Sequence, residues 1–233
     1  MGFYFTFAFQ PIVDVNKKEV FAYEALVRGL HGESAQDILS MVVDANRYRF
    51  DQDCRVKSIE LAKKLDMKAC ISINFLPNAV YSPEQCIRTT IAAAEKANFP
   101  LEKIIFEVTE NEHVHDPQKL LSIFNYYKNR GFSTAIDDFG AGYAGLGLLA
   151  EFQPNFIKID IKLVRDIDSN PVKQAMVKGI LVIADLLNIQ IIAEGVETAA
   201  EGRWFKENGV SLMQGFYFAR PGFESLPDVI NWV

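Results

Sequence analysis

Residues 133–160 read STAIDDFGAGYAGLGLLAEFQPNFIKID. An apolar run ends here in two adjacent acids, Asp137 and Asp138, a short stretch of helical character follows, and a second apolar run, FIKID, completes the segment. A strand, a helix and a strand in this order predict a βα unit in which the helix packs on the outside of a parallel sheet.

The same alternation continues along almost the whole chain. The patterns predict strands at 5–13, 19–29, 69–75, 103–110, 133–138, 156–160, 189–194 and 211–218. They predict helices at 35–65 (a pair), 83–97, 117–129, 172–187 and 199–207, and a turn at 16–18 that joins the first two strands. Eight strands in 233 residues favour an α/β fold with a (β/α)8 barrel. Because no linker-like segment divides the chain, we expect a single domain over residues 1–233.

Composition excludes several classes of partner and site. The net charge is -6 and the pI about 5.2, which argues against binding to a DNA duplex, although a small anion remains compatible. Three cysteines without CxxC spacing indicate reduced thiols in the cytoplasm rather than a disulfide framework or a zinc site. No apolar run is long enough for a transmembrane helix, so no membrane partner is expected.

Polar residues end nearly every predicted strand: Glu24, Asn74, Glu107, Asp137, Lys158, Glu194 and Gln214. In a barrel of parallel strands the carboxyl ends converge on one mouth, which is where catalytic residues of this fold lie. Polar residues at seven strand ends therefore predict a functional site at that mouth.

The oxygen-bearing residues of this set predict a metal site of hard ligands: Glu24, Asn74, Glu107, Asp137, Asp138 and Glu194. Such ligands select Mg²⁺, Mn²⁺ or Ca²⁺ over metals that prefer thiolates. Two adjacent acids remain ionised if cations lie between them, so Asp137 is a candidate bridge between two metals and Asp138 a ligand of the second.

Simpler interpretations of the same residues stay open. Two acids before Gly140 are also typical of a turn or a helix cap. Glu24 and Arg28 lie on one side of a strand, which also fits a surface ion pair. Lys158 between apolar neighbours is costly unless it meets an anion.

Eight ordered segments resemble the EAL-domain phosphodiesterases, which hydrolyse cyclic di-GMP: FQPIVD, EALVR, INFLP, FEVTE, DDFGAGY, FIKID, AEGVE and QGFYFARP. The resemblance covers essentially the whole chain. It implies a modified TIM (β/α)8 barrel whose first strand runs antiparallel to the others. Four positions depart from residues common in the family, and none of them is a predicted ligand: Leu76, Ala141, Ala144 and Phe216.

The resemblance also implies a role for each site residue. One metal would be bound by Glu24, Asn74, Glu107 and Asp137, and a second by Asp137 and Asp138, with Glu194 as a further metal-site residue or a base. The implied catalytic residues are Lys158, Glu194, Asp138, Glu110 and Glu197, of which the last two would brace the active-site loop and its surroundings. The implied substrate-binding residues are Gln10, Leu26, Arg28 and Gln214, with Arg28 at a phosphate.

The implied activity is attack of a metal-activated water on cyclic di-GMP, which yields linear pGpG and lowers signalling that controls biofilm or motility in bacteria. The resemblance implies a two-metal site for Mg²⁺ or Mn²⁺, inhibition by Ca²⁺, a homodimer and a cytoplasmic location. The chain is either a stand-alone enzyme or a piece of a regulator whose sensor domain or partner protein lies outside it. Two alternatives are a catalytically silent cyclic di-GMP receptor and a Mg²⁺-dependent lyase, which should ignore dinucleotides.

Overall fold

The structure is a computed structural model, and it describes residues 3–80, 82–109, 117–142 and 145–233. The strands are β1 (Thr6–Asp14), β2 (Glu19–Arg28), β3 (Cys70–Asn74), β4 (Ile104–Thr109), β5 (Ser133–Phe139), β6 (Phe156–Ile159), β7 (Gln190–Ala193), β8 (Leu212–Gln214) and β9 (Gly222–Phe223). The helices are α1 (Ala35–Leu39), α2 (Asp44–Lys64), α3 (Pro83–Ala97), α4 (Pro117–Asn129), α5 (Gly145–Glu151), α6 (Ile161–Val164), α7 (Pro171–Leu186) and α8 (Ala199–Glu207). Two 3-10 turns, η1 (Pro77–Ala79) and η2 (Leu101–Lys103), complete the set.

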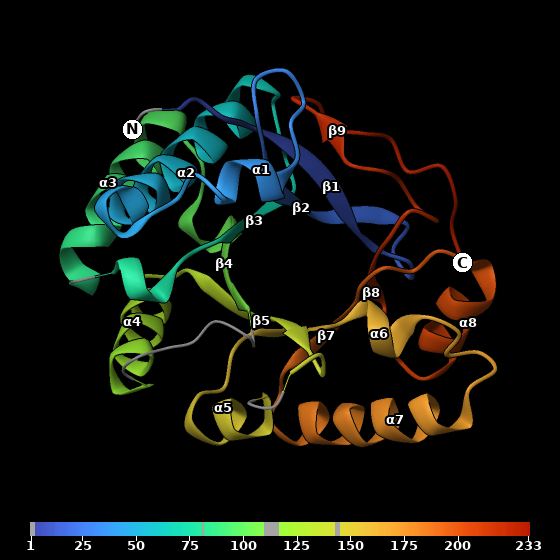
Figure 1. The fold of residues 1–233 in the computed structure, drawn as a ribbon. Helices are drawn as coiled ribbons and strands as arrows, with labels where there is room; N and C mark the ends of the chain where they lie inside the picture. Colours follow the sequence, from blue (N-terminus) through green and yellow to red (C-terminus); the bar gives the residue numbers. More distant parts are fainter. Residues whose placement is uncertain (1–2, 81, 110–116, 143–144) are drawn as a thin grey trace.

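Strands β1 to β8 form a closed barrel with the helices outside it (Figure 1). Strands β2 to β8 are parallel in chain order, whereas β1 pairs antiparallel with both β2 and β8 and so completes the circle. The prediction of a TIM-like barrel with an antiparallel first strand is therefore confirmed. The physical cause is the short connection between β1 and β2, because parallel neighbours would need a long crossover.

The barrel has separate apolar clusters inside and outside. The inner cluster is small and consists of Ile12, Ala22, Ile105, Ala135, Phe156, Ile192 and Leu212. The outer cluster is far larger and lies where the strands and the surrounding helices pack together. Since side chains alternate between the two faces of a strand, the inner residues lie two positions from the polar residues at the mouth. The apolar layer thus forms the floor of the site.

Most element boundaries agree closely with the sequence predictions. Helices α3, α4 and α8 have the predicted bounds, because Ser82 and Thr198 cap two of them and prolines begin α3 and α4. The sequence patterns did not predict η1, η2, α6 or β9, which contain two to four residues each and are too short to show a period. Among the described residues, no helix combines the length and apolar character needed to cross a membrane.

Candidate metal centre

The mouth of the barrel is lined by one polar side chain from each of several strands. Gln10 lies on β1, Glu24 on β2, Asn74 on β3, Glu107 on β4, Asp137 on β5, Lys158 on β6 and Gln214 on β8, and Glu194 directly follows β7. Most of these side chains are buried, Glu107 and Lys158 completely, while Glu194 is half-buried and Asn74 exposed. The barrel therefore brings together residues that lie up to 204 positions apart in the chain.

The ammonium group of Lys158 lies at the centre of four carboxylates. Its Nζ atom is 2.7 Å from Glu194, 2.9 Å from Glu107, 3.0 Å from Asp137 and 3.3 Å from Glu24. Burial lowers the pKa of Lys158, but the four carboxylates together raise it well above its ordinary value. The four short contacts and the raised pKa both favour the charged form of Lys158.

Amide side chains orient the Glu24 carboxylate. Asn74 donates to Glu24 Oε1 at 3.1 Å, and Gln214 donates to Glu24 Oε2 at 2.9 Å. Gln10, which lies opposite Glu24 in the β1–β2 register, donates to the carbonyl of Ala219 at 3.2 Å. Glu24 therefore points into the barrel with both oxygens held by neighbours.

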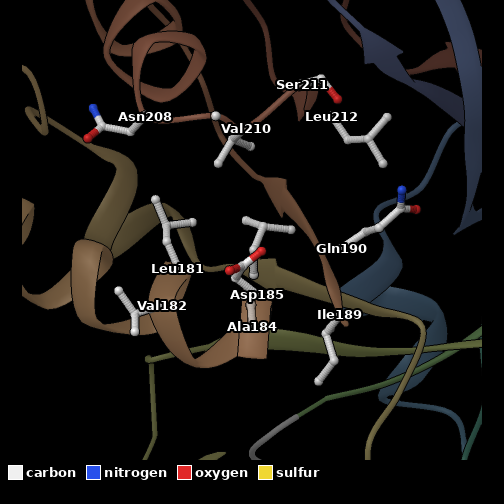
Figure 2. Close-up of a pocket in the computed structure, with 12 residues that line it drawn as sticks. Leu181, Val182, Ala184, Asp185, Ile189, Gln190, Asn208, Val210, Ser211 and Leu212 are labelled. Carbon is white, nitrogen blue, oxygen red and sulfur yellow. The ribbon is translucent and has the colours of Figure 1, made fainter. Parts of the chain in front are cut away.

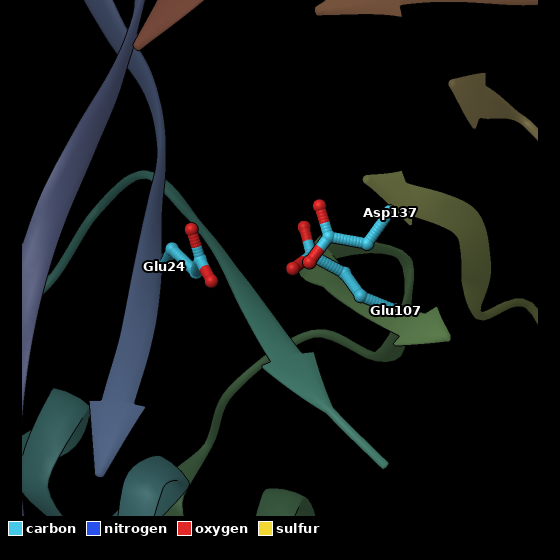
Figure 3. Close-up of side chains that lie close together, drawn as sticks. All are labelled: Glu24, Glu107 and Asp137. Atoms are coloured by element: carbon cyan, nitrogen blue, oxygen red, sulfur yellow. The ribbon is translucent and has the colours of Figure 1, made fainter. Parts of the chain in front are cut away.

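Two groups of three carboxylates share Asp137. Oxygens of Glu24, Glu107 and Asp137 lie within 4.8 Å of one another, and so do oxygens of Asp137, Asp138 and Glu194. Figure 3 shows the first three side chains pointing toward one another from β2, β4 and β5. All the ligand atoms are oxygens, which is the donor set of Mg²⁺, Mn²⁺ and Ca²⁺. The donor set of this site therefore fits divalent cations of this class.

The crowding of carboxylates changes the proton affinity of several of them. Burial, together with the charges of Glu24 and Asp137, raises the pKa of Glu107 to about 8 despite the nearby ammonium. Burial and the neighbouring Asp137 also raise the pKa of Glu194 well above its usual range. Without a cation, the buried cluster therefore retains protons near neutral pH.

Asp138 has a backbone conformation that is uncommon for an aspartate. Its φ is 55°, in the left-handed region, and its amide donates to the Asp137 carboxylate at 3.0 Å. This conformation interrupts the β5–β6 register between Ile136 and Phe139. Burial and the charges of Asp137 and Asp160 raise the pKa of Asp138 to about 6. The left-handed residue lets two successive acids face one site, which a regular strand does not allow.

Comparison with known proteins identifies the family. A family model described as EAL domain matches residues 4–221. This chain belongs to the EAL domain family. The chain is 31% identical over 224 residues to the Escherichia coli blue light- and temperature-regulated antirepressor BluF, covering 96% of this chain and 56% of BluF. It is 30% identical to the probable cyclic di-GMP phosphodiesterase PdeN of the same organism, covering 98% of this chain and 45% of PdeN. The EAL domain thus spans about half the length of these curated relatives.

Two solved structures are similar over nearly the whole EAL domain. A standalone versatile EAL protein from Vibrio cholerae O395, in its c-di-GMP bound form, is 57% identical with a TM-score of 0.96, covering 98% of this chain and 97% of that one. The manganese and cy-diGMP complex of Klebsiella pneumoniae BlrP1 is 36% identical with a TM-score of 0.91, covering 98% of this chain and 58% of that one.

A pocket of about 230 Å³ opens beside the carboxylates of the EAL domain. Its lining includes Gln10, Glu24, Asp138, Glu194 and Gln214, and also Phe216 at its rim. A larger pocket of about 470 Å³ lies at the opposite end of the barrel, where β7 and β8 begin beside α7 (Figure 2). Among the described residues, only the smaller pocket is lined by the carboxylates that group around a possible metal, so we assign it to the site.

Four predicted site residues lie apart from the carboxylate cluster or cannot be placed. Leu26 and Arg28 follow Glu24 toward the end of β2, both half-buried, and Arg28 donates to the carbonyl of Val27 at 2.7 Å. Glu197 lines the pocket and pairs with Arg165 at 2.7 Å rather than with the cluster. Glu110 lies outside the described residues.

Sequence reasoning missed two residues of the site. Ser72 is completely buried and donates a hydrogen bond to Glu107 Oε1. Asp160 lines the pocket, caps α6 and is hydrogen-bonded to Asp138. Asp160 ends the apolar run FIKID, so the strand-end rule that selected Lys158 applied equally to it. Ser72 lies two residues before Asn74, and the period of a strand places both on one face.

Proposed function

We propose that this EAL domain hydrolyses cyclic di-GMP to linear pGpG with the help of two divalent cations. One observation carries the proposal. Two clusters of three carboxylates share Asp137, and Asp137 lies beside the ammonium of Lys158. The names of PdeN and of the two cyclic di-GMP complexes support the choice of substrate. The resulting loss of the dinucleotide would lower signalling through it, with biofilm or motility as the regulated processes.

The ligand sets follow the two carboxylate groups. Glu24, Asn74, Glu107 and Asp137 would hold one cation. Asp137, Asp138 and Glu194 would hold the second, and Glu194 is also a candidate base. When bound, such cations lower the pKa of water toward neutrality and stabilise charge on phosphoryl oxygens.

Side chains of the protein supply the remaining parts of the mechanism. Lys158 contributes a fixed positive charge that is oriented by its carboxylate neighbours and stabilises developing negative charge on the phosphoryl group. Arg28 would contact a phosphate, while Gln10, Leu26 and Gln214 would orient the substrate at the mouth. Glu110 and Glu197 would brace the loop and the surroundings of the site.

We propose Mg²⁺ or Mn²⁺ as the activating metal and Ca²⁺ as an inhibitor. Mg²⁺ requires near-ideal octahedral geometry, whereas Ca²⁺ accepts more ligands in a flexible arrangement. A reaction that needs two closely spaced metals with defined geometry should therefore tolerate Ca²⁺ poorly. The complexes of BlrP1 with manganese and with calcium support the class of metal.

The test is hydrolysis of cyclic di-GMP with Mg²⁺, Mn²⁺ or Ca²⁺, followed by chromatography for pGpG, with EDTA as the blank. Glu24→Ala removes a ligand of the first cation and should lower kcat by about 100-fold or more. Asp185→Asn, an exposed acid in the pocket at the other end of the barrel, is the matched control and should retain full activity. Metal-independent turnover, or full activity of Glu24→Ala, would contradict the proposal.

The second candidate function is a cyclic di-GMP receptor that does not turn over its ligand. The relative BluF, which is named an antirepressor, favours this alternative. Equilibrium dialysis with cyclic di-GMP separates the two functions, because a receptor binds it in Mg²⁺ without forming pGpG.

We also propose that the protein is a cytoplasmic homodimer, with a sensor domain or partner protein as a further possible partner. Apolar side chains exposed on α5 and α7 support the dimer: Leu146, Val172, Met176, Val182 and Leu186. Sedimentation equilibrium measures the mass directly, and a monomer at high micromolar concentration would exclude the dimer.

A further inference from the structure

A buried ion pair lies on helix α2, outside the barrel. The carboxylate of Asp51 and the guanidinium of Arg55 are 2.8 Å apart on successive turns of α2, and both side chains are almost completely inaccessible to solvent. A buried ion pair is weak evidence for stability, because the cost of removing both charges from water can exceed their attraction. The pair therefore needs an explanation beyond folding.

Arg55 packs against three aromatic rings, two of which belong to residues next to predicted metal ligands. Its guanidinium lies 5.4 Å from the ring of Phe75, 4.9 Å from that of Phe106 and 5.5 Å from that of Tyr127, and it donates to the Tyr127 hydroxyl at 2.7 Å. Phe75 follows Asn74, and Phe106 precedes Glu107. Because neighbouring side chains of a strand point to opposite faces, the rings face Arg55 while Asn74 and Glu107 face the mouth.

Asp51 holds the backbone at the end of β3. Its Oδ1 atom accepts a hydrogen bond of 2.9 Å from the amide of Leu76, two residues after Asn74. One residue earlier, the amide of Phe75 donates to the carbonyl of Glu107 at 3.0 Å. Asp51 is thus the acceptor that fixes the chain just where the parallel pairing of β3 with β4 ends.

We propose that Asp51, held in place by Arg55, is a positioning residue that fixes the chain after Asn74 and so sets Asn74 and Glu107 for the first cation. The proposal rests on the metal site of the proposed function. Residues that support metal ligands typically change affinity by about 10- to 100-fold when they are removed. Asp51 makes its contact from outside the barrel, through the backbone, and touches neither metal nor substrate in this assignment.

The test separates the hydrogen bond of Asp51 from the charge of the pair. Asp51→Ala with Arg55→Met removes both charges and the acceptor for the Leu76 amide, and Met fills the space between the aromatic rings. Asp51→Asn with Arg55→Met removes both charges but keeps an oxygen at the same place. Ile59→Ala, a buried residue one turn further along α2, is the control for loss of stability alone.

The readouts are the Mn²⁺ dissociation constant, measured by electron paramagnetic resonance of the free ion, and hydrogen exchange of the Leu76 amide. The Ala/Met variant should bind Mn²⁺ about tenfold more weakly and exchange Leu76 faster. The Asn/Met variant and Ile59→Ala should remain within about twofold of the unmodified protein, so rescue by Asn identifies the hydrogen bond as the cause.

Two results would overturn the inference. One is an Ala/Met variant that is folded and binds Mn²⁺ as tightly as the unmodified protein. The other is an Asn/Met variant with tenfold weaker binding, a result that is decisive even if the Ala/Met variant does not fold. Failure of the proposed function is recognisable separately, because the unmodified protein would then bind Mn²⁺ no better than Glu24→Ala.

Discussion

Lys158 controls the balance of charge at the mouth of the barrel. It is the one basic side chain in contact with Glu24, Glu107, Asp137 and Glu194 among the residues that the structure describes. Its burial excludes water from these contacts, which strengthens each of them. The residue therefore has two separable effects, one on the carboxylates and one on any substrate that lies above them.

Replacing Lys158 with methionine should separate these effects. Lys158→Met keeps the length of the side chain but removes the charge, so we expect kcat for cyclic di-GMP to fall by about 100-fold or more. Mn²⁺ affinity should stay the same or increase, because the ammonium no longer competes for the carboxylates. Lys162→Met, an exposed lysine on α6, is the control. A variant with full turnover would show that the Lys158 charge has no catalytic role.

The raised pKa of Glu107 predicts how stability depends on pH. The native carboxyl has a pKa of about 8, against an ordinary value of 4.5, so between these values the native state binds more protons than the unfolded state. In EDTA, the free energy of unfolding should therefore decrease as the pH rises from 5 to 8. Bound Mn²⁺ displaces the proton, so the increase in Tm on adding Mn²⁺ should be larger at pH 8 than at pH 6.

Differential scanning fluorimetry measures both trends. Glu107→Gln has no proton to lose and is the control, and it should flatten the dependence on pH in EDTA. A metal-free Tm that increases steadily from pH 5 to 8 would contradict the predicted pKa.

Most individual residues of the carboxylate site were predicted from the sequence. Polar residues that end apolar runs were visible without coordinates, and the structure brings Glu24, Glu107, Asp137 and Glu194 together around Lys158. Asp51 and Arg55 were not predictable, because charged residues on a helix normally face solvent. Their burial depends on Tyr127, which lies 72 residues further along the chain.

The turn after β8 has no room for a side chain at Gly215. A Cβ atom on Gly215 would lie 2.0 Å from the carbonyl oxygen of Val196, a backbone atom that cannot rotate away. The amide of Val196 in turn donates to the carbonyl of Gln214 at 3.0 Å. This close approach joins the segment that carries Glu194 to the strand that carries Gln214.

Gly215→Ala should therefore affect both stability and the site. We expect a loss of about 1–3 kcal/mol in the free energy of unfolding, measured with urea, together with weaker Mn²⁺ binding as Glu194 moves. Gly179→Ala is the matched control, because Gly179 is exposed within α7 with nothing near its missing Cβ. That change should stabilise the protein by about 0.5–1 kcal/mol. Equal stability of the two variants would show that the turn has room to adjust.

Helices and strands were predictable from the sequence where their apolar residues recur at a regular spacing or where a capping residue marks an end. The apolar period of α3 and α8 agrees with their caps, and both helices appear as predicted. The left-handed conformation of Asp138 was not predictable, because it depends on β6 pairing beside it rather than on local preference. The two-residue strand β9 is likewise formed only by its contact with β1.

The whole molecule should unfold in one step. Because β1 pairs with β2 on one edge and with β8 and β9 on the other, no subset of strands has a complete barrel of its own. We expect one calorimetric transition in EDTA, with equal calorimetric and van't Hoff enthalpies, which would support a single domain over residues 1–233. Two separated transitions would contradict that prediction.

The closure of the barrel has a consequence for synthesis. Ile12 pairs with Gln214, so about 200 residues must be added before that contact can form. At about 5–20 residues per second, a ribosome needs about 10–40 s for this. During that interval the edge of β1 in the β1–β2 hairpin exposes unpaired backbone N–H and C=O groups. These groups are able to form hydrogen bonds with other chains. Slow or stalled translation should therefore lengthen the time during which the nascent chain is able to aggregate through this edge.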